Sequence, residues 1–271
     1  MFEEILACLD GSSLAEKILP LARGMIAPKG GGLTLLRVVA DQAELAAEEA
    51  YLRDCARQYG AKLRFVIAPD PARAICLELD RNPHAIAALT THGRTAWMEA
   101  ILGSVALRVI GESKRPTILL RPLESESEAL GKISQVAVAL DGSELSEKMI
   151  PCGVRAAQSL SARLLLLQAL PRQASHDALP EHVRSDVLES SYLHNKAADI
   201  KAAYQINADW EVLHGSPDES ICQYLKSMPD TLLAMTTHAR TGVERFVLGS
   251  VAGYCVRHAG VPLLLYSPRA Q

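Results

Sequence analysis

A polar loop followed by a predicted helix start occurs twice in this sequence, and its residue types suit the binding of an anion. Residues 90–95 read Thr-Thr-His-Gly-Arg-Thr, and residues 103–106 read Gly-Ser-Val-Ala. Residues 236–241 read Thr-Thr-His-Ala-Arg-Thr, and residues 249–252 repeat Gly-Ser-Val-Ala at the same spacing. Backbone N–H groups at a helix N-terminus bind phosphate and carboxylate groups. The pattern therefore predicts an anion site in each half of the chain, with Ser104 as the N-cap of the first of these helices.

Asp10-Gly11 and Asp141-Gly142 each follow a short apolar run, and the role of their carboxylates has two interpretations. Asp10 either shapes a turn through its own backbone, or accepts hydrogen bonds from a ligand, such as a ribose hydroxyl or an adenine amine. His92 and His238 either pack within the loop or contact ribose or phosphate. Arg94 either pairs with a phosphate or points into solvent. The sequence leaves all three pairs of alternatives open.

We predict no catalytic set and no metal site built from protein side chains. The chain has no GxSxG elbow, no P-loop and no HExxH or HxxxH spacing. None of the six cysteines forms a CxxC pair, and most stand in apolar stretches. We expect them to act as small buried hydrophobic residues in a reducing compartment, rather than as disulfides or metal ligands.

An internal repeat divides the chain into two similar parts. Residues 10–20 match residues 141–151 at seven of eleven positions, at an offset of 131, whereas His92 and His238 are offset by 146. The second part therefore carries about fifteen extra residues, which include a predicted loop at 171–180. We predict a first domain at 1–121, a linker at 122–132 and a second domain at 133–271, and we call the two domains the first and second half.

Apolar runs alternate with amphipathic ones, which predicts an α/β fold with a parallel sheet covered by helices on both faces. Strands are expected near 5–9, 33–39, 63–68, 84–91 and 117–121, and near 133–140, 163–170, 209–213, 230–237 and 262–267. A single helix is expected after the first strand, capped by Ser12 or Ser13, and a long one at 181–206. Ligands of such sheets bind at the carboxyl ends of the strands where strand order reverses. If the first strand lies beside the fourth, Asp10 lies near Thr90 and Gly93.

Composition limits the function classes. The net charge is −3, and the chain lacks the clustered Lys and Arg that nucleic-acid binding needs. No apolar stretch reaches the length of about 18 residues that spans a membrane, and the N-terminal residues do not read as a secretory signal. We therefore expect a cytoplasmic protein without nucleic-acid or membrane partners.

These motifs together resemble the universal stress protein family in its tandem two-domain form. The residues that carry the resemblance are 7–12 (Ala-Cys-Leu-Asp-Gly-Ser), 138–143 (Val-Ala-Leu-Asp-Gly-Ser), both Thr-His loops with their Gly-Ser-Val-Ala segments, and 261–265 (Val-Pro-Leu-Leu-Leu). The resemblance implies two repeated domains, each with five parallel strands in the order 3-2-1-4-5 and helices on both faces. It also implies pairing of the domains through their fifth strands as an intrachain pseudo-dimer, with a further homodimer left open.

The resemblance implies an adenine nucleotide, ATP or AMP, with or without Mg²⁺. ATP-binding members carry Gly-x2-Gly-x9-Gly-[Ser/Thr], which falls on Thr90, Gly93 and Gly103-Ser104. The acidic contact falls on Asp10 and the adenine-packing residue on Val38. The predicted contacts of the first half are Cys8, Leu9, Asp10, Val38, Leu89, Thr90, His92, Gly93, Arg94, Gly103, Ser104 and Val105. A weaker second site comprises Asp141, Ala169, Thr236, His238, Ala239, Gly249, Ser250 and Val251.

This sequence departs from the family pattern in both halves. Thr90 replaces the first glycine. In the second half Thr236 and Ala239 replace the first and second glycines, and Ala169 stands at the adenine-packing position. A β-carbon where backbone approaches phosphate takes up room, and at positive φ it costs roughly 1 kcal/mol. We therefore expect the first half to bind the nucleotide if either does.

The predicted function is a stress-response nucleotide-binding protein that acts as a sensor or adaptor and not as an enzyme. The first alternative is a nucleotide-free structural or interaction protein of the same fold. A slow ATPase is the second alternative. A nucleotidyl transferase is disfavoured, because Asp10-Gly11-Ser12 stands where those folds carry an HxGH motif.

Overall fold

Strands and helices alternate along both halves. The computed structural model describes residues 2–27, 30–91, 102–122, 132–170, 181–237 and 248–268. The first half contains β1 (Glu4–Leu9), α1 (Ser13–Glu16), α2 (Leu19–Gly24), β2 (Gly32–Val39), α3 (Gln42–Tyr59), β3 (Lys62–Ile67), α4 (Pro71–Arg81), β4 (Ala85–Thr90), α5 (Ser104–Glu112) and β5 (Thr117–Leu120). The second half contains β6 (Gln135–Leu140), α6 (Glu144–Glu147), α7 (Ile150–Leu160), β7 (Arg163–Leu170), α8 (Glu181–Tyr204), β8 (Ala208–His214), α9 (Pro217–Lys226), β9 (Thr231–Thr236), α10 (Ser250–His258) and β10 (Leu263–Tyr266).

The strands form one ten-stranded sheet in the order β3-β2-β1-β4-β5-β10-β9-β6-β7-β8. Within the first half, all neighbouring strands pair in parallel. The same holds within the second half. The predicted order 3-2-1-4-5 is thus confirmed in each half.

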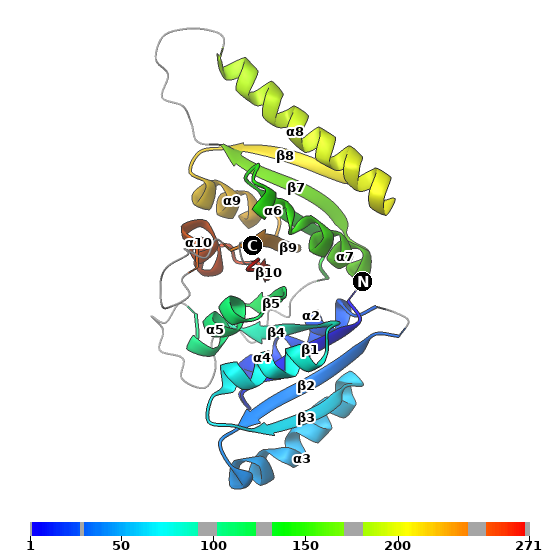
Figure 1. Ribbon diagram of the computed structural model, residues 1–271, viewed down its shortest axis with the longest axis vertical. Helices are drawn as coiled ribbons and strands as arrows, with labels where there is room; N and C mark the ends of the chain where they lie inside the picture. Colours follow the sequence, from blue (N-terminus) through cyan, green and yellow to red (C-terminus); the bar gives the residue numbers. More distant parts are fainter. Residues whose placement is uncertain are drawn as a thin grey trace.

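The two halves meet at an antiparallel pair of short strands, β5 and β10, in the middle of the molecule (Figure 1). Ile118 lies opposite Leu264, and Leu119 lies opposite Leu263; all four side chains are buried. Burial of a Leu or Ile side chain contributes roughly 1.5–3 kcal/mol. The apolar composition of both strands therefore explains why the sheet runs continuously from one half to the other.

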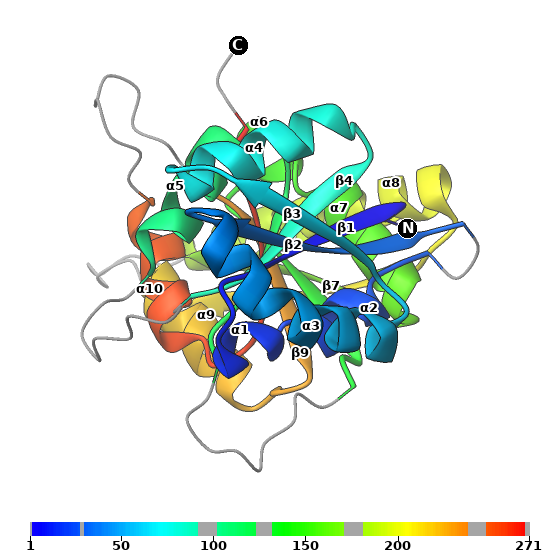
Figure 2. The ribbon, with the colours of Figure 1, turned by 90° about the horizontal axis from the view of Figure 1, so that it is seen from below.

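Helices cover both faces of the sheet, as the near-continuous apolar strands predict (Figure 2). One core packs residues of α1, α2, α3, α7 and α8 against the sheet, among them Ala15, Leu21, Leu52, Val154 and Leu193. The other core packs residues of α4, α5, α9 and α10 against the opposite face, among them Ile75, Val109, Cys222 and Val256. Each core extends across both halves.

The region after the first strand differs from the prediction of a single helix. α1 ends at Glu16, and α2 begins at Leu19 with Pro20 in its first turn. Proline has no backbone N–H and clashes with the carbonyl four residues earlier, so it starts a helix and does not continue one. Pro151 divides α6 from α7 in the same way.

Several predicted features lie partly or wholly outside the described residues. The loop at 171–180 and most of the predicted linker, 123–131, are among them, and the predicted domain limits stay a prediction. α8 ends two residues before the predicted position.

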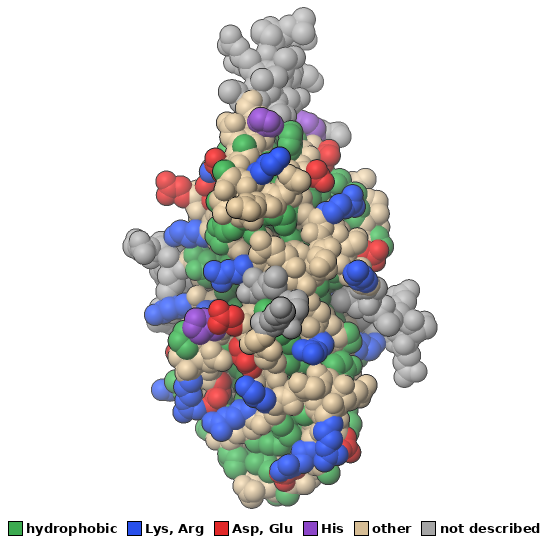
Figure 3. All heavy atoms as spheres, turned by 90° about the vertical axis from the view of Figure 1, so that its right-hand side faces the viewer, with side chains coloured by type: hydrophobic (Ala, Val, Ile, Leu, Met, Phe, Trp, Pro, Cys, Tyr) green, Lys and Arg blue, Asp and Glu red, His purple; other side chains and the backbone are tan. Residues whose placement is uncertain are grey.

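Among the described helices, none is both long enough and apolar enough to cross a bilayer. On the face shown in Figure 3, basic and acidic side chains are interspersed.

Candidate functional site

The carboxyl ends of the first and fourth strands of each half lie side by side. Ala7 of β1 is in register with Ala88 of β4, and Val138 of β6 is in register with Ala234 of β9. Asp10 follows β1 directly, and Thr90 ends β4. Strand order therefore brings the predicted acidic residue and the start of the Thr-His loop to the same edge, where α/β sheets bind their ligands.

The Asp-Gly turns have the same geometry in both halves. Gly11 and Gly142 both have φ of 81°, a left-handed conformation that favours glycine. Asp10 Oδ1 accepts hydrogen bonds from the Ser12 backbone nitrogen at 3.0 Å and from Ser12 Oγ at 2.6 Å. The turn-shaping interpretation of Asp10 is therefore observed, and the ligand-binding interpretation stays a prediction.

The helix that follows the Thr-His loop begins at Ser104, but its N-cap differs from the prediction. Gly103 is the N-cap of α5 and makes no side-chain cap, so Ser104 is the first helical residue and its predicted capping role is wrong. The Gly103 nitrogen donates to the Thr91 carbonyl at 2.7 Å, and a β-carbon on Gly103 would lie 3.2 Å from that oxygen. A side chain at this position would therefore crowd the Thr91 carbonyl, a contact that the Gly-Ser sequence alone does not reveal.

A cavity of about 760 Å³ opens at this edge of the sheet in the second half. Among its lining residues are six of the eight predicted contacts of the second half: Asp141, Ala169, Thr236, Gly249, Ser250 and Val251. The other two, His238 and Ala239, lie outside the described residues. Residues separated by more than a hundred positions thus meet around one space, as the repeat and the strand order together predict.

The walls of the cavity are mainly apolar. Its polar groups lie at the carboxyl ends of the strands and at the N-terminus of α10. Sequence reasoning missed eight lining residues: Ala139, Leu140, Ser146, Pro217, Ile221, Met235, Leu248 and Ala252. The repeat could have identified three of them, since Cys8, Leu9 and Leu89 align with Ala139, Leu140 and Met235. Pro217 and Ile221 are four residues apart on α9, a spacing that places them on one helix face.

Two groups give the cavity its electrostatic character. The Asp141 carboxylate is exposed at its border, where Oδ1 accepts from the Ser143 nitrogen at 3.0 Å and from Ser143 Oγ at 2.6 Å. Gly249 is the N-cap of α10, and the first three residues of that helix also line the cavity. The N-terminal N–H groups of a helix lack intrahelical partners and attract anions. The cavity thus combines an acceptor, apolar walls and an anion-attracting helix end.

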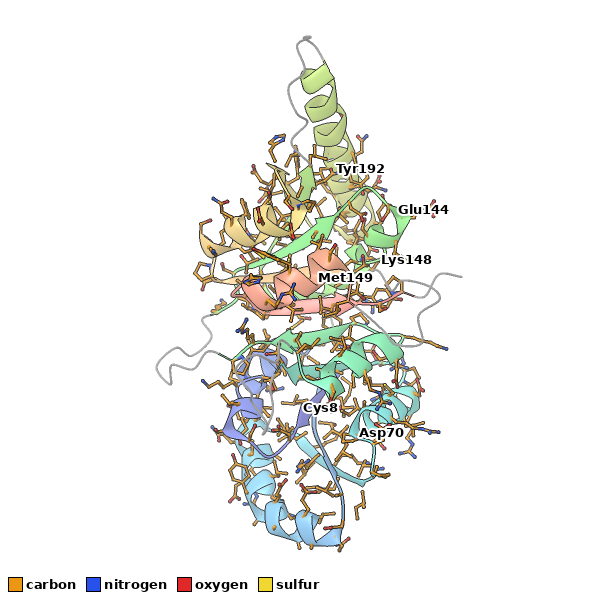
Figure 4. All side chains as sticks on the ribbon, turned by 90° about the vertical axis from the view of Figure 1, so that its left-hand side faces the viewer. Cys8, Asp70, Glu144, Lys148, Met149 and Tyr192 are labelled. Carbon is orange, nitrogen blue, oxygen red and sulfur yellow. The ribbon has the colours of Figure 1, made fainter. Side chains whose placement is uncertain are left out.

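The first half carries larger side chains at two equivalent positions. Cys8 stands where Ala139 lines the second-half cavity, and Val38 stands where Ala169 does. Cys8 lies on β1, within the first half (Figure 4), and its thiol donates to the Leu6 carbonyl at 3.5 Å. Burial, reinforced by the nearby Cys76 thiol, raises the pKa of Cys8, so this group is a neutral thiol. Cys8 and Val38 are therefore larger than their second-half equivalents, Ala139 and Ala169.

The other predicted residues of the first half lie at the same sheet edge. Leu9 ends β1, Leu89 and Thr90 end β4, and Ser104 and Val105 begin α5. His92, Gly93 and Arg94 lie outside the described residues. The roles predicted for them stay predictions.

In the first half, an ion pair connects α4 and α5, the helices equivalent to α9 and α10 beside the second-half cavity. Arg108 of α5 contacts Asp70, the N-cap of α4, with 2.8 Å between Nη1 and Oδ1. The equivalent residues in the second half are Ser216 and Tyr254, which cannot form an ion pair. The helices beside the second-half cavity therefore lack this particular charged connection.

In the part of the chain that the structure describes, no cluster of three His, Cys, Asp or Glu could hold a metal ion.

Comparison with known proteins identifies a sequence family and a shared fold. The model of the universal stress protein family matches residues 40–121 and 132–267. Universal stress protein MJ0531 of Methanocaldococcus jannaschii is 24% identical over 139 residues, which cover 48% of this chain and 80% of that protein.

Solved structures share the fold over nearly the whole chain. A universal stress protein from Archaeoglobus fulgidus has a TM-score of 0.74 at 17% identity, with 99% of this chain and 100% of that chain covered. A putative universal stress protein from Pseudomonas aeruginosa has a TM-score of 0.68 at 16% identity, with 98% and 94% covered. At these identities the likeness concerns the fold alone.

Proposed function

Because this chain belongs to the universal stress protein family, we propose that it binds an adenine nucleotide, ATP or AMP, at the edge of its sheet. The observation that carries the proposal is the second-half cavity, where six independently predicted contact residues line one space. A cavity of about 760 Å³ lies within the range of roughly 300–1,000 Å³ of small-molecule sites.

The walls of the cavity suit a flat, weakly polar base. Ala139 and Ala169 end neighbouring strands and present only methyl groups, while Ile221 of α9 and Met235 of β9 add larger apolar surfaces. Ligand pockets are mostly apolar, with a few polar groups that fix orientation. Asp141 would supply such a group, because a carboxylate accepts hydrogen bonds from ribose hydroxyls or an adenine amine.

The start of α10 suits the phosphates. The backbone of Gly249, Ser250 and Val251 lies at the cavity, and the partial positive charge of a helix N-terminus favours an anion there. Ser250, like Ser104, is the first residue of its helix and not its N-cap. Its hydroxyl would donate a hydrogen bond to a phosphate oxygen at this helix end.

The cavity favours the second half as the binding half, opposite to the expectation from glycine spacing. Ala239 and Thr236 replace family glycines and still argue for a weaker phosphate site. Cys8 and Val38, however, are larger than Ala139 and Ala169 at the positions proposed to flank the base. We assign greater weight to the cavity of the second half, because it brings six of the predicted contacts around one space.

We further propose that the protein acts as a cytoplasmic sensor or adaptor that does not turn over its nucleotide. The antiparallel contact of β5 with β10 supports an intrachain pseudo-dimer, in which the two halves pair as separate subunits would. In the proposed adaptor role, the nucleotide is bound and not turned over. Its presence would change which surface of the protein is available to a partner.

Mass spectrometry of small molecules released from the purified, denatured protein tests the proposal. We expect ATP or AMP to be recovered, and we expect added ATP, with and without Mg²⁺, to raise the midpoint of thermal unfolding. Absence of both effects would favour the nucleotide-free structural alternative. Multiple turnover of ATP by the purified chain would instead favour the slow ATPase.

A further inference from the structure

Two cysteines of the second half lie close together beside the cavity. Cys222 Sγ of α9 and Cys255 Sγ of α10 are 3.8 Å apart, and the two side chains are 3% and 1% exposed. All six cysteines of the chain are free. A disulfide bond joins sulfur atoms at about 2.05 Å, so a small movement of the two helices or a change of side-chain rotamer would bring this pair to bonding distance.

The pair lies directly behind the walls of the cavity. Cys222 follows the lining residue Ile221 on α9, and Cys255 stands one helical turn beyond the lining residue Val251 on α10. α9 and α10 pack against each other on the same face of the sheet. A change in the separation of these helices therefore moves two walls of the cavity at once.

We propose that Cys222 and Cys255 form a disulfide when the protein meets a peroxide, and that this bond reduces the affinity of the cavity for its ligand. The second part rests on the proposed nucleotide binding, whereas the first does not. Ile221, the residue before Cys222, lines the cavity.

The reaction balances with a hydroperoxide as the two-electron oxidant. The Cys222 thiolate attacks one peroxide oxygen, the O–O bond breaks, and Cys222 becomes a sulfenic acid while water leaves after protonation. The Cys255 sulfur then attacks the Cys222 sulfur, the S–O bond breaks, and the thiol proton leaves with the hydroxyl as a second water. Two thiols and one hydrogen peroxide give one disulfide and two waters.

The two thiols are suited to different steps. The hydrogen bond between the two thiols lowers the pKa of Cys222 and raises that of Cys255. Nearby Lys226 acts in the same direction on Cys222, while burial and Asp218 oppose it. Since the thiolate is the nucleophile, Cys222 is the group that reacts first and Cys255 the group that resolves.

The first half lacks this pair and provides a matched control. Cys76 aligns with Cys222, but Val109 stands at the position of Cys255. The first half connects its two helices by the Asp70–Arg108 ion pair instead. Cys255→Val therefore gives the second half the side chain that the same position of the repeat already carries.

The test treats the full chain with hydrogen peroxide, blocks remaining thiols and maps disulfides by mass spectrometry. We expect a peptide linked through Cys222 and Cys255 in the wild type and in Cys76→Ser, reversed by dithiothreitol, and no such peptide in Cys255→Val. We also expect oxidation to weaken ATP binding by about fivefold or more, with no change in Cys255→Val. Absence of the linked peptide from folded protein would overturn the proposal, as would equal ATP affinity of both forms.

A second readout separates this proposal from the proposed function. Amide hydrogen exchange of residues 217–226 and 250–258 reports the helix movement without any ligand, and we expect oxidation to change it. If neither form binds ATP, the proposed function fails. The linked peptide and a changed exchange rate would still support the redox pair, and an unchanged exchange rate would count against it.

Discussion

Asp141 Oδ1 accepts hydrogen bonds from both the backbone nitrogen and the hydroxyl of Ser143, at 3.0 and 2.6 Å, while its carboxylate borders the cavity. Ser143 in turn caps α6. Asp141 therefore stabilises the turn and also lies where it would contact the ligand. Substitutions that affect only one of these roles should change either stability or ligand affinity.

Replacing Asp141 by Asn and by Ala separates the two roles. Asn retains an oxygen for the turn but has no charge, so we expect near wild-type stability and weaker ATP binding. Ala removes the acceptor, and loss of a hydrogen bond costs about 0.5–1.5 kcal/mol, so Asp141→Ala should lose both stability and at least about tenfold in affinity, or 1.4 kcal/mol. Calorimetric titration with ATP and urea unfolding measure the two effects.

Asp10→Ala is the control for this pair of variants. Asp10 makes the same turn contacts in the first half, so its loss should reduce stability and leave ATP affinity unchanged. The assignment to the second half is wrong if Asp10→Ala abolishes binding while Asp141→Ala retains it.

Glu16 and Glu147 occupy equivalent positions but have different surroundings. Glu147 accepts a hydrogen bond from the Tyr192 hydroxyl at 2.9 Å and pairs with Lys196 at 2.7 Å. Glu16 Oε1 is buried without a hydrogen-bond partner, and burial raises the pKa of this carboxyl. The same substitution should therefore have opposite effects at the two positions.

We expect Glu16→Gln to raise the free energy of unfolding at pH 7 by a few tenths of a kcal/mol, a small value because the group is partly solvated. A raised folded pKa means that ionisation opposes folding, so the gain should appear above the unfolded pKa of about 4.3 and vanish below it. Glu147→Gln should destabilise at pH 7. Urea unfolding at pH 7 and pH 3.5 checks both; a loss of stability in Glu16→Gln at pH 7 would contradict the explanation.

The ionisation of Asp70 should make the free energy of unfolding depend on pH in the acidic range. The Arg73 backbone N–H and then the Arg108 guanidinium hold the pKa of Asp70 below its usual value. A lowered folded pKa gives stability that is present above the unfolded pKa of about 3.9 and is lost as the pH falls through the folded pKa.

Asp70→Asn should therefore weaken the dependence of unfolding free energy on pH between about pH 4 and pH 2, compared with the wild type. Equal slopes for Asp70→Asn and the wild type would show that the ion pair with Arg108 does not contribute.

The fold follows closely from the sequence because local and global signals agree. The apolar runs, the Asp-Gly turns and the repeat predict the strands, and the resemblance adds their order, which the register of Ala7 with Ala88 confirms. The division of the first helix was missed although Pro20 indicates it. The N-cap at Gly103 was missed because its cause is a tertiary contact with the Thr91 carbonyl, which no local pattern shows.

The candidate site was predictable as a set of residues but not as a volume. Repeat spacing and strand order identify Asp141, Thr236 and Ser250 as neighbours. The volume of the second-half cavity depends on how Ala139 and Ala169 face α9 and α10, which lie far away in the chain. Glycine spacing concerns only the loop expected to hold the phosphates, and it predicts the first half as the better nucleotide site. The cavity described above lies in the second half.

The central claim is that the second-half cavity holds the nucleotide, and calorimetric titration of ATP into Ala169→Val tests it most directly. Valine at 169 copies Val38 and adds two methyl groups to the wall beside the proposed position of the base, so we predict a loss of about tenfold in affinity. Val38→Ala, the reverse change in the first half, should not weaken binding. Unchanged affinity of Ala169→Val, together with altered binding in Val38→Ala, would contradict the claim.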